Sequence, residues 1–216
     1  MARRFTDRTI WITGASSGIG EALAKSLSAE GAALILSARR EERLKALDLT
    51  DAPTSPPAVE KAKACKGRID VLINNAGISQ RARVEDTTLQ TVRRVMEINF
   101  FAIVDLTQQV LPTMLAQGEG HIVNMSSVAG YVSTPLRSTY SASKHALRAW
   151  SDSLRAEVSG RGLSVTTICP GYVKTEIAQS ALTGSGTAKG VDDGVFANAM
   201  TADAAAAKMT TAIHKK

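Results

Sequence analysis

The sequence predicts an α/β protein with a doubly wound parallel sheet, flanked by helices on both faces, in a single domain over residues 1–216. Short β-branched runs alternate along the chain with longer segments of helical spacing. These runs are apolar throughout, which is typical of parallel strands covered by helices on both faces. With 216 residues, 44% of them hydrophobic and 21% charged, the chain is long enough to form one sizeable core.

The expected elements follow from this alternation. The predicted strands are Thr9–Thr13, Leu34–Leu36, Val71–Ile73, His121–Val123 and Val165–Ile168. The predicted helices are Ile19–Glu30, which ends before Gly31, and then 88–117, 139–159 and 202–213. Right-handed crossovers between parallel strands then place helices on both faces of the sheet.

The segment between Ser37 and Asp70 is short for this fold. Its 32 residues contain a helix of barely two turns, Glu41–Ala46, and one strand-like stub at 47–50. Two crossovers of about 10–12 residues each and a strand of about 5 only just fit. We therefore predict that residues are absent near Leu47-Asp48.

Composition excludes several classes of protein. No run of 18 apolar residues occurs, so no membrane-spanning helix is expected, and the basic start leads into no apolar stretch of a secretory signal. The two cysteines, Cys65 and Cys169, lie 104 positions apart without a CxxC or histidine cluster. This argues against a disulfide scaffold or a metal site and favours a reducing, cytoplasmic location.

The net charge of +6 allows three interpretations: a surface for nucleic acid or membrane, a solvated basic exterior, or a site for an anionic cofactor. Lys and Arg occur in pairs rather than long runs, which favours the solvated exterior over a nucleic-acid or membrane surface.

A glycine-rich turn lies between the first strand and the first helix. Residues 13–20 read TGASSGIG. Gly14 allows a tight turn, Gly18 lets the backbone approach a pyrophosphate, and Gly20 lets the helix pack on the strand. Ser16, Ser17 and Ile19 complete a loop at the helix N-terminus, where free N–H groups favour an anion. A dinucleotide-binding Rossmann-type fold is predicted, with a plain βα turn as the alternative.

Four later motifs occur in a characteristic order. They are NNAG at 74–77, NMSSVAG at 124–130, YSASK at 140–144 and PGYVKT at 170–175. With the G-x-x-x-G-x-G spacing of the first loop, the chain resembles the short-chain dehydrogenase/reductase family over about residues 5 to 177. The resemblance implies an oxidoreductase that moves a hydride between a nicotinamide cofactor and a small-molecule alcohol, ketone or aldehyde.

Tyr140 and Lys144 are the predicted acid–base pair. They are four residues apart in a helical stretch, so both side chains lie on one face, about 6 Å apart along the axis. A phenol with a pKa near 10 is a poor proton shuttle at neutral pH, and a nearby ammonium lowers that pKa. The resemblance further implies that Lys144 holds the nicotinamide ribose.

Ser127 and Asn99 complete the predicted catalytic set. Ser127 follows a strand at the carboxyl edge of the sheet, where its hydroxyl can donate to the substrate oxygen. Ser126 competes for this role, and the family pattern favours Ser127. The resemblance implies that the Asn99 amide holds a water linked to Lys144, and a simple helix kink is the alternative.

The cofactor is predicted to be NADP(H). The position after the second strand that is acidic in NAD-binding folds is Ala38 here, and it is followed by Arg39 and Arg40, which can pair with a 2′-phosphate. Alternatively, both arginines are simply solvated. The resemblance implies further cofactor contacts from Asp48, Leu49, Asn74, Ala76, Gly77, Pro170, Gly171, Val173 and Thr175.

The remaining expectations concern partners and the substrate loop. Residues 177–200 are expected to form a substrate loop that is mobile from Ser180 to Met200, and Tyr131, Val132 and Arg137 to shape the pocket. A homodimer or homotetramer is expected to pair through 88–117 and 139–159, with Trp150 as an anchor. Cys169, His121 and His145 are interpreted as structural. A cofactor-binding sensor or scaffold without turnover is the alternative function, and a family isomerase or dehydratase is less favoured.

Overall fold

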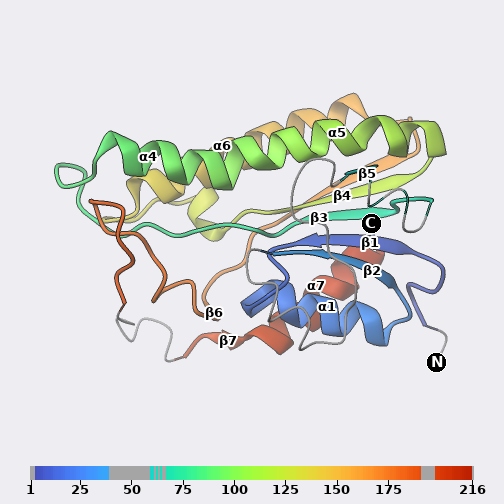
Figure 1. Ribbon diagram of the computed structural model, residues 1–216, viewed down its shortest axis with the longest axis horizontal. Coiled ribbons are helices and arrows are strands. Elements are labelled where there is room, and N and C mark those ends of the chain that lie inside the picture. The colour runs from blue at the N-terminus through green and yellow to red at the C-terminus, as the bar shows by residue number, and fades with distance from the viewer. Residues whose placement is uncertain are drawn as a thin grey trace.

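The protein is a five-stranded parallel sheet between two layers of helices (Figure 1). The computed structural model describes residues 3–38, 59–60, 62, 64, 67–190 and 198–215. The strands of the main sheet are β1 Thr9–Thr13, β2 Ala33–Ser37, β3 Val71–Asn74, β4 Gly120–Met125 and β5 Leu163–Ile168. The prediction of a doubly wound α/β fold is confirmed.

The helices also follow the predicted order. They are α1 Gly18–Ala29, α4 Leu89–Met96, the π-helix η1 Glu97–Phe101, α5 Ala102–Gln117, the 3₁₀ turn η2 Val128–Gly130, α6 Ser138–Glu157 and α7 Ala202–Lys215. The single helix predicted over 88–117 is therefore three consecutive segments. Such π segments arise where one extra residue is accommodated in a helix, often at functional sites.

The order of strands across the sheet is β2-β1-β3-β4-β5, with every neighbouring pair parallel. From β1 the chain first adds β2 on one side and later adds β3 on the other. This reversal makes the carboxyl ends of β1 and β3 the switch point, where ligands bind in open α/β sheets.

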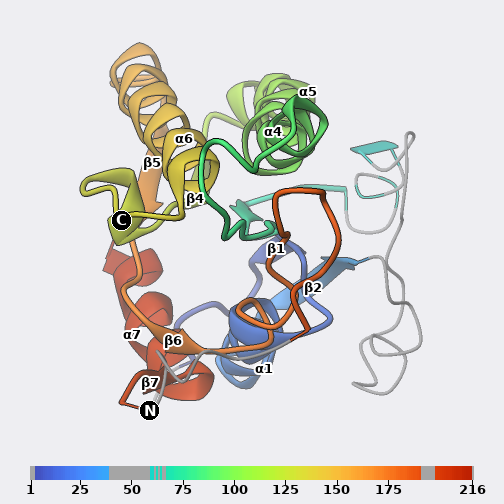
Figure 2. The same ribbon diagram turned by 90° about the vertical axis from the view of Figure 1, so that its left-hand side faces the viewer.

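The two faces of the sheet bury separate apolar clusters because successive side chains of a strand point to opposite sides. Ile10 and Ile12 of β1 pack in the cluster with α1 and α7, whereas Trp11 packs in the cluster with α5 and α6. Figure 2 shows α1 and α7 on one side of the sheet and α4, α5 and α6 on the other.

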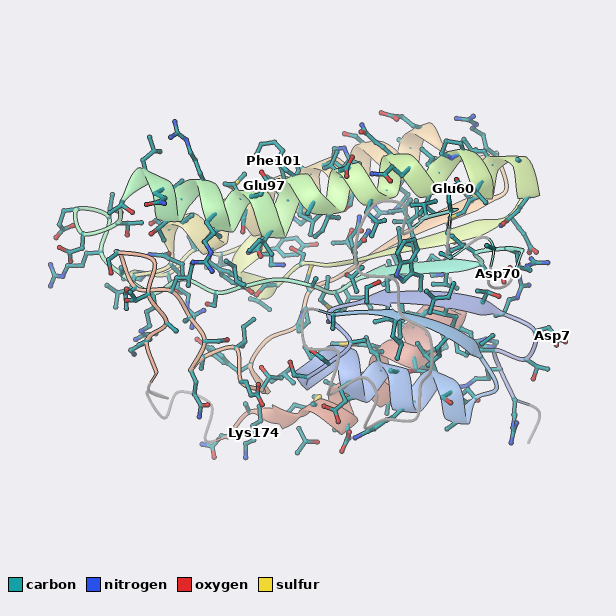
Figure 3. All side chains as sticks on the ribbon, in the orientation of Figure 1. Asp7, Glu60, Asp70, Glu97, Phe101 and Lys174 are labelled. Atoms are coloured by element: carbon teal, nitrogen blue, oxygen red, sulfur yellow. The ribbon has the colours of Figure 1, made fainter. Side chains whose placement is uncertain are left out.

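The direction of the strands can be followed in Figure 3. Asp7 and Asp70, which precede β1 and β3, lie at the right-hand end, and Lys174, which lies beyond β5, is at the lower left. All five strands therefore run from right to left, and the carboxyl edge of the sheet is at the left. Glu97 and Phe101 of η1 lie on the upper side of the helical layer, away from the sheet.

A small second sheet was not predicted from the sequence. The strands β6 Val173–Lys174 and β7 Met200–Thr201 pair in parallel as a small second sheet at the carboxyl edge. They bring the start of α7 next to the chain segment that leaves β5. Two-residue strands carry no detectable period, so their pairing depends on the tertiary structure.

Several predictions lie outside the described residues. They are the helix at 41–46, the strand stub at 47–50, the absence of residues near Leu47-Asp48, and the cofactor contacts of Arg39, Arg40, Asp48 and Leu49. Among the described residues, β2 is an edge strand of the main sheet.

Candidate active site

The glycine-rich turn after β1 has the conformation that the sequence predicts. Gly14 and Gly18 have φ of 68° and 56°, in the left-handed region that suits glycine. A Cβ on Gly20 would lie 2.3 Å from the Gly14 carbonyl oxygen, so the first turn of α1 packs directly on the loop. The loop therefore presents bare backbone at the start of a helix, where N–H groups are available to an anion.

The NNAG turn after β3 is tied to this loop. The Thr13 hydroxyl accepts hydrogen bonds from the backbone N–H groups of Asn75 and Ala76, both at 3.0 Å. The Asn75 amide donates to the carbonyls of Thr13 and Gly14 at 3.0 and 3.2 Å. Thr13 and Asn75 thus fix the two loops at the switch point, although the sequence prediction included neither residue.

Asn74 makes its side-chain contacts inside the core. It is 1% exposed, and its Nδ2 donates to Thr107 Oγ1 at 3.0 Å and to Asn124 Oδ1 at 2.8 Å. Asn124 in turn donates to Ser151 Oγ on α6 at 2.8 Å. The amide of Asn74 therefore ties β3 and β4 to the helical layer, and any cofactor contact at this position would come from its backbone.

The two serines after β4 have different surroundings. Ser126 is buried, and its Oγ donates to the Lys144 carbonyl oxygen at 3.0 Å, which pins α6 to the end of β4. The Ser127 side chain instead lies close enough to Tyr140 to act on the pKa of its phenol, and its Oγ accepts a hydrogen bond from the Ala129 N–H at 3.1 Å. Of the two candidates, only Ser127 has its hydroxyl beside the phenol.

Tyr140 lies in the first turn of α6 and is buried. Burial raises the pKa of its phenol above the usual value of 10.0, and the nearby Ser127 side chain and the charge of Arg137 only partly oppose this. Lys144 is not among the groups that shift this pKa, so its predicted effect on the phenol stays a prediction. Tyr140 is a neutral phenol at neutral pH, ready to donate a proton.

Lys144 is buried one turn further along the same face of α6. Its Nζ donates to the Met125 carbonyl oxygen at 2.8 Å and lies 5.8 Å from the centre of the Tyr140 ring. Burial lowers the pKa of this ammonium to about 8, partly opposed by the nearby Cys169. Because an ammonium has three N–H donors, two remain without a partner among the described residues.

Asn99 lies in the π-helix and faces the site, but its amide is already engaged. Nδ2 donates to the Ile78 carbonyl at 2.9 Å and to Ser143 Oγ at 3.0 Å, while Oδ1 accepts from the Ile78 N–H at 2.9 Å. The Ser143 hydroxyl donates a hydrogen bond to the Tyr140 carbonyl oxygen at 2.7 Å. Both donor hydrogens of the amide are used, so the predicted water could contact this side chain only through Oδ1.

The predicted cofactor residues that follow β5 gather at the same edge. A Cβ on Gly18 would lie 3.0 Å from Thr175 Cγ2, so Thr175 borders the glycine-rich turn. The Pro170 carbonyl accepts a hydrogen bond from the Val128 N–H at 3.0 Å, and Val173 is buried in β6. Gly171 is exposed and has no atom near its Cβ position.

Gly77 lies between the glycine-rich loop and the side chains of Lys144 and Asn99. A Cβ at this position would lie 3.6 Å from Lys144 Nζ and 3.2 Å from Asn99 Oδ1. On the other side, a Cβ on Gly14 would meet the Ala76 backbone at 2.8 Å. The phosphate loop, the NNAG turn and the Tyr140–Lys144 face of α6 are thus contiguous at one edge of the sheet.

The expected substrate loop is held in place over its first half. Leu182 exchanges backbone hydrogen bonds with Ser79 and Arg81 at 2.9 and 2.8 Å, and the Gly184 carbonyl accepts from the Thr91 hydroxyl at 2.9 Å. Several backbone groups of residues 180–190 are thus paired, and the mobility expected from Ser180 to Met200 stays a prediction. Residues 191–197 lie outside the described part of the chain.

The interpretation of the remaining reactive side chains as structural fits their contacts. His121 is buried and its Nε2 lies 2.8 Å from Thr166 Oγ1, while His145 Nδ1 lies 2.9 Å from the Ser141 carbonyl oxygen. Within the described residues, no cluster of His, Cys, Asp and Glu could hold a metal ion.

Comparison with protein families decides the classification of the chain. A family profile described as short chain dehydrogenase matches residues 8–185. The chain belongs to the short-chain dehydrogenase family. The Rossmann-type fold and the oxidoreductase class predicted from the motifs are thereby confirmed.

Relatives of this short-chain dehydrogenase match it over most of its length. The dehydrogenase/reductase SDR family protein 7-like of Drosophila melanogaster is 39% identical over 229 residues, which cover 97% of this chain and 70% of the relative. The SDR family member 7B of Xenopus laevis is 40% identical over 227 residues, with 95% and 70% covered. Because 229 aligned positions exceed the 216 residues of this chain, the Drosophila protein has residues within the matched span that have no counterpart here.

Solved structures agree with this family assignment. A short-chain dehydrogenase from Streptomyces avermitilis superposes with a TM-score of 0.81 at 31% identity, covering 95% of this chain and 83% of that one. A gluconate 5-dehydrogenase from Burkholderia cenocepacia, in complex with NADP and tartrate, gives 0.76 at 29% identity, with 82% and 76% covered.

Proposed function

We propose that this short-chain dehydrogenase interconverts an alcohol and a ketone or aldehyde with NADP(H), and that Tyr140 is its acid–base residue. One observation carries the proposal. The buried Tyr140 phenol lies close enough to Ser127 for this side chain to act on its pKa, and Lys144 lies on the same helix face, next to the turn that meets the glycine-rich loop. A cofactor-binding sensor or scaffold would need the glycine-rich loop but not this side-chain set.

The glycine-rich loop fits a dinucleotide phosphate. The Cβ positions of Gly14, Gly18 and Gly20 are closed by neighbouring atoms, and the bare backbone at the start of α1 offers its N–H groups to an anion. The residues proposed to hold the cofactor here are Gly14, Ser16, Ser17, Gly18, Ile19, Gly20, Asn74, Ala76, Gly77, Pro170, Gly171, Val173 and Thr175. When bound, the nicotinamide supplies or accepts the hydride.

The side chains of the protein then handle the proton and the developing charge. Because burial keeps the phenol of Tyr140 protonated at neutral pH, it can donate to a carbonyl oxygen as this oxygen becomes negative. Ser127 donates a second hydrogen bond to the same oxygen. The two unpartnered N–H groups of Lys144 hold the ribose and keep a positive charge close to the phenol. Asn99 acts by fixing Ser143, and through it the first turn of α6.

The choice of NADP(H) over NAD(H) rests on Ala38, Arg39 and Arg40. The position where a carboxylate would repel a 2′-phosphate is an alanine, and the two following guanidinium groups attract one. The NADP in the complex of the gluconate 5-dehydrogenase is consistent with this choice. Asp48 and Leu49 are proposed to contact the adenine.

We further propose a homodimer or homotetramer that pairs through α5 and α6. A groove between these helices is lined by Leu111 and Trp150, with polar residues around them. Among the described residues, no helix is long and apolar enough to cross a membrane. The cytoplasmic location stays a prediction.

The central test is Tyr140→Phe. NADPH oxidation at 340 nm is followed with a panel of small ketones and aldehydes, and NADPH and NADH affinities are measured by fluorescence titration. We expect the variant to lose turnover by about a thousandfold and to keep its NADPH affinity, because proton transfer by a positioned group contributes about 10²–10⁴-fold. Undiminished turnover would contradict the role of Tyr140, no turnover by the unaltered protein would favour a sensor, and tighter binding of NADH would overturn the cofactor assignment.

A further inference from the structure

Arg137 stands next to the predicted proton donor. It is the residue just before α6, one turn ahead of Tyr140. Its guanidinium carbon lies 5.8 Å from the centre of the Tyr140 ring, as far from it as the Lys144 ammonium, but it is only half-buried. Arg137 is therefore a second cation at Tyr140, and one that is accessible from the solvent.

The charge of Arg137 has no acidic partner among the described residues. Its one side-chain hydrogen bond goes from Nη1 to the Ser79 hydroxyl at 3.2 Å, which leaves most of its five N–H donors unused. By contrast, the arginines at the opposite edge of the sheet, Arg8 and Arg68, are each paired with two carboxylates. An unpaired guanidinium beside a reacting group is available to a ligand.

The backbone that holds Arg137 in place is strained at the preceding residue, Leu136. Leu136, immediately before it, has φ of 68°, a conformation that an L side chain disfavours, and its carbonyl accepts a hydrogen bond from the Ala82 N–H at 3.0 Å. The Ser79 and Ala82 contacts tie Arg137 and Leu136 to one segment, 79–82, whose backbone is in turn paired with Leu182. Such strain persists where the surrounding structure imposes it, often at ligand sites.

We propose that Arg137 selects substrates that carry a carboxylate close to the carbonyl that is reduced. This inference rests on the proposed function, because it takes the Tyr140 hydroxyl as the point that fixes the carbonyl oxygen. A single planar guanidinium matches a carboxylate in charge and can bind it in a bidentate manner. Since its carbon is 5.8 Å from the Tyr140 ring, the carboxylate would be only a few bonds from the reacting carbonyl.

The test compares acids with their uncharged esters. Acetoacetate and methyl acetoacetate share the ketone and differ in charge, and acetonylphosphonate carries a phosphonate on the same skeleton. Their binding is measured by isothermal titration with the protein saturated with NADP⁺, and again without cofactor. Because an oxidised cofactor cannot reduce a ketone, this readout does not depend on turnover.

We expect the protein to bind acetoacetate at least tenfold more tightly than its methyl ester. Arg137→Met removes the charge, so it should lower the affinity for the acid to that for the ester and leave the ester unchanged. Arg137→Lys should keep part of the preference. Ser79→Ala keeps the charge of Arg137 and loses only the hydrogen bond that holds it, so this variant should keep most of the preference. Arg161→Met, an exposed arginine beyond the far end of α6, is the control and should change neither affinity.

Three results overturn the proposal: equal binding of acid and ester, measurable binding of neither, or an acid preference that survives Arg137→Met. Tighter binding of acetonylphosphonate than of acetoacetate overturns the assignment to carboxylates. The proposed reaction fails separately, in the NADPH assay with Tyr140→Phe. If turnover does not depend on Tyr140, the proposed reaction is wrong. If the preference for the acid remains in that case, the carboxylate site at Arg137 is still supported.

Discussion

Charged side chains are paired differently at the two edges of the sheet. At the amino edge, the Asp70 carboxylate is buried and accepts the Thr9 N–H at 2.7 Å together with hydrogen bonds from Arg8 and Arg68. Glu119 bridges the same two arginines. The hydrogen bonds with Arg8 and Arg68 lower the pKa of the Glu119 carboxyl, and those with Glu119 and Asp70 raise the pKa of both guanidinium groups.

At the carboxyl edge, the two cations beside Tyr140 have no carboxylate partner among the described residues. Lys144 is buried with one carbonyl as its partner, and its pKa is lowered to about 8 by burial. The Tyr140 phenol beside it has a raised pKa for the same reason. Arg137 completes this set without a carboxylate among the described residues.

The comparison separates stability from function within one sheet. The charges at the amino edge form ion pairs with one another and stabilise the fold. Uncompensated groups at the carboxyl edge cost stability and remain available to a cofactor and a substrate. Local conflicts of this kind are expected at functional sites.

Replacement of Lys144 by Met should have the largest effect on activity. Turnover of NADPH with a carbonyl substrate is expected to fall by about a thousandfold, because the cation beside the proton donor is lost. The unfolding midpoint should stay the same or rise, since a buried ammonium without a carboxylate is removed. Thermal unfolding and steady-state rates check both outcomes. Lys25→Met, an exposed lysine paired with Glu21, is the control and should leave the rates unchanged. A large fall in stability of Lys144→Met would contradict this account.

Two glycines with the same backbone conformation, one at each edge, offer a matched pair. Gly14 has φ of 68° and its Cβ position lies 2.8 Å from the Ala76 backbone, whereas Gly118 has φ of 69° and no atom within 4 Å. Gly118→Ala should cost about 1–2 kcal/mol from conformation alone. Gly14→Ala should cost about 2–3 kcal/mol more, because backbone must move. Denaturant unfolding gives both values, and equal losses would show that the two loops are not in contact.

At the amino edge, Asp70→Asn should lower stability and spare activity. Hydrogen bonds to a charged group contribute about 1.5–3 kcal/mol, so we expect a loss of about 2 kcal/mol and a fall of about 4–8 °C in the unfolding midpoint. Glu119→Gln serves as the control, since its side chain is 39% exposed and exposed ion pairs contribute about 0–1 kcal/mol. A change in kcat of Asp70→Asn at a temperature where it is folded would refute the separation of the two edges.

The pH profile gives the smallest expected effect. Lys144 has its pKa lowered to about 8, so it is mostly charged at pH 7 and loses its proton as the pH rises through 8. We expect kcat/KM for carbonyl reduction to be level near pH 7 and to fall about tenfold by pH 9. Tyr140, whose pKa is raised, stays protonated over this range. Lys144→Arg should remove the fall if it retains activity, and a level profile of the unaltered enzyme up to pH 9 would speak against a role for the ammonium.

The pattern of the sequence was sufficient for the fold, and the motifs supplied the candidate residues. The order of apolar runs predicted five parallel strands, and the glycine spacing predicted the turn at the switch point. These signals are local, because a strand period and a left-handed glycine are properties of a few neighbouring residues. The π-helix around Asn99 was harder to predict from the sequence, since it differs from an α-helix by one residue inside a continuous helical pattern.

The sequence therefore determined which residue types stand at the carboxyl edge, and in what order along the chain. Only the tertiary structure decided that both donor hydrogens of the Asn99 amide are already used, and that Arg137 lies beside Tyr140 without a carboxylate partner among the described residues. It also decided the protonation of the site, because a pKa depends on burial and on charges brought near from other segments. Residue spacing fixes the distance between two groups on one helix, but it does not fix how much water surrounds them.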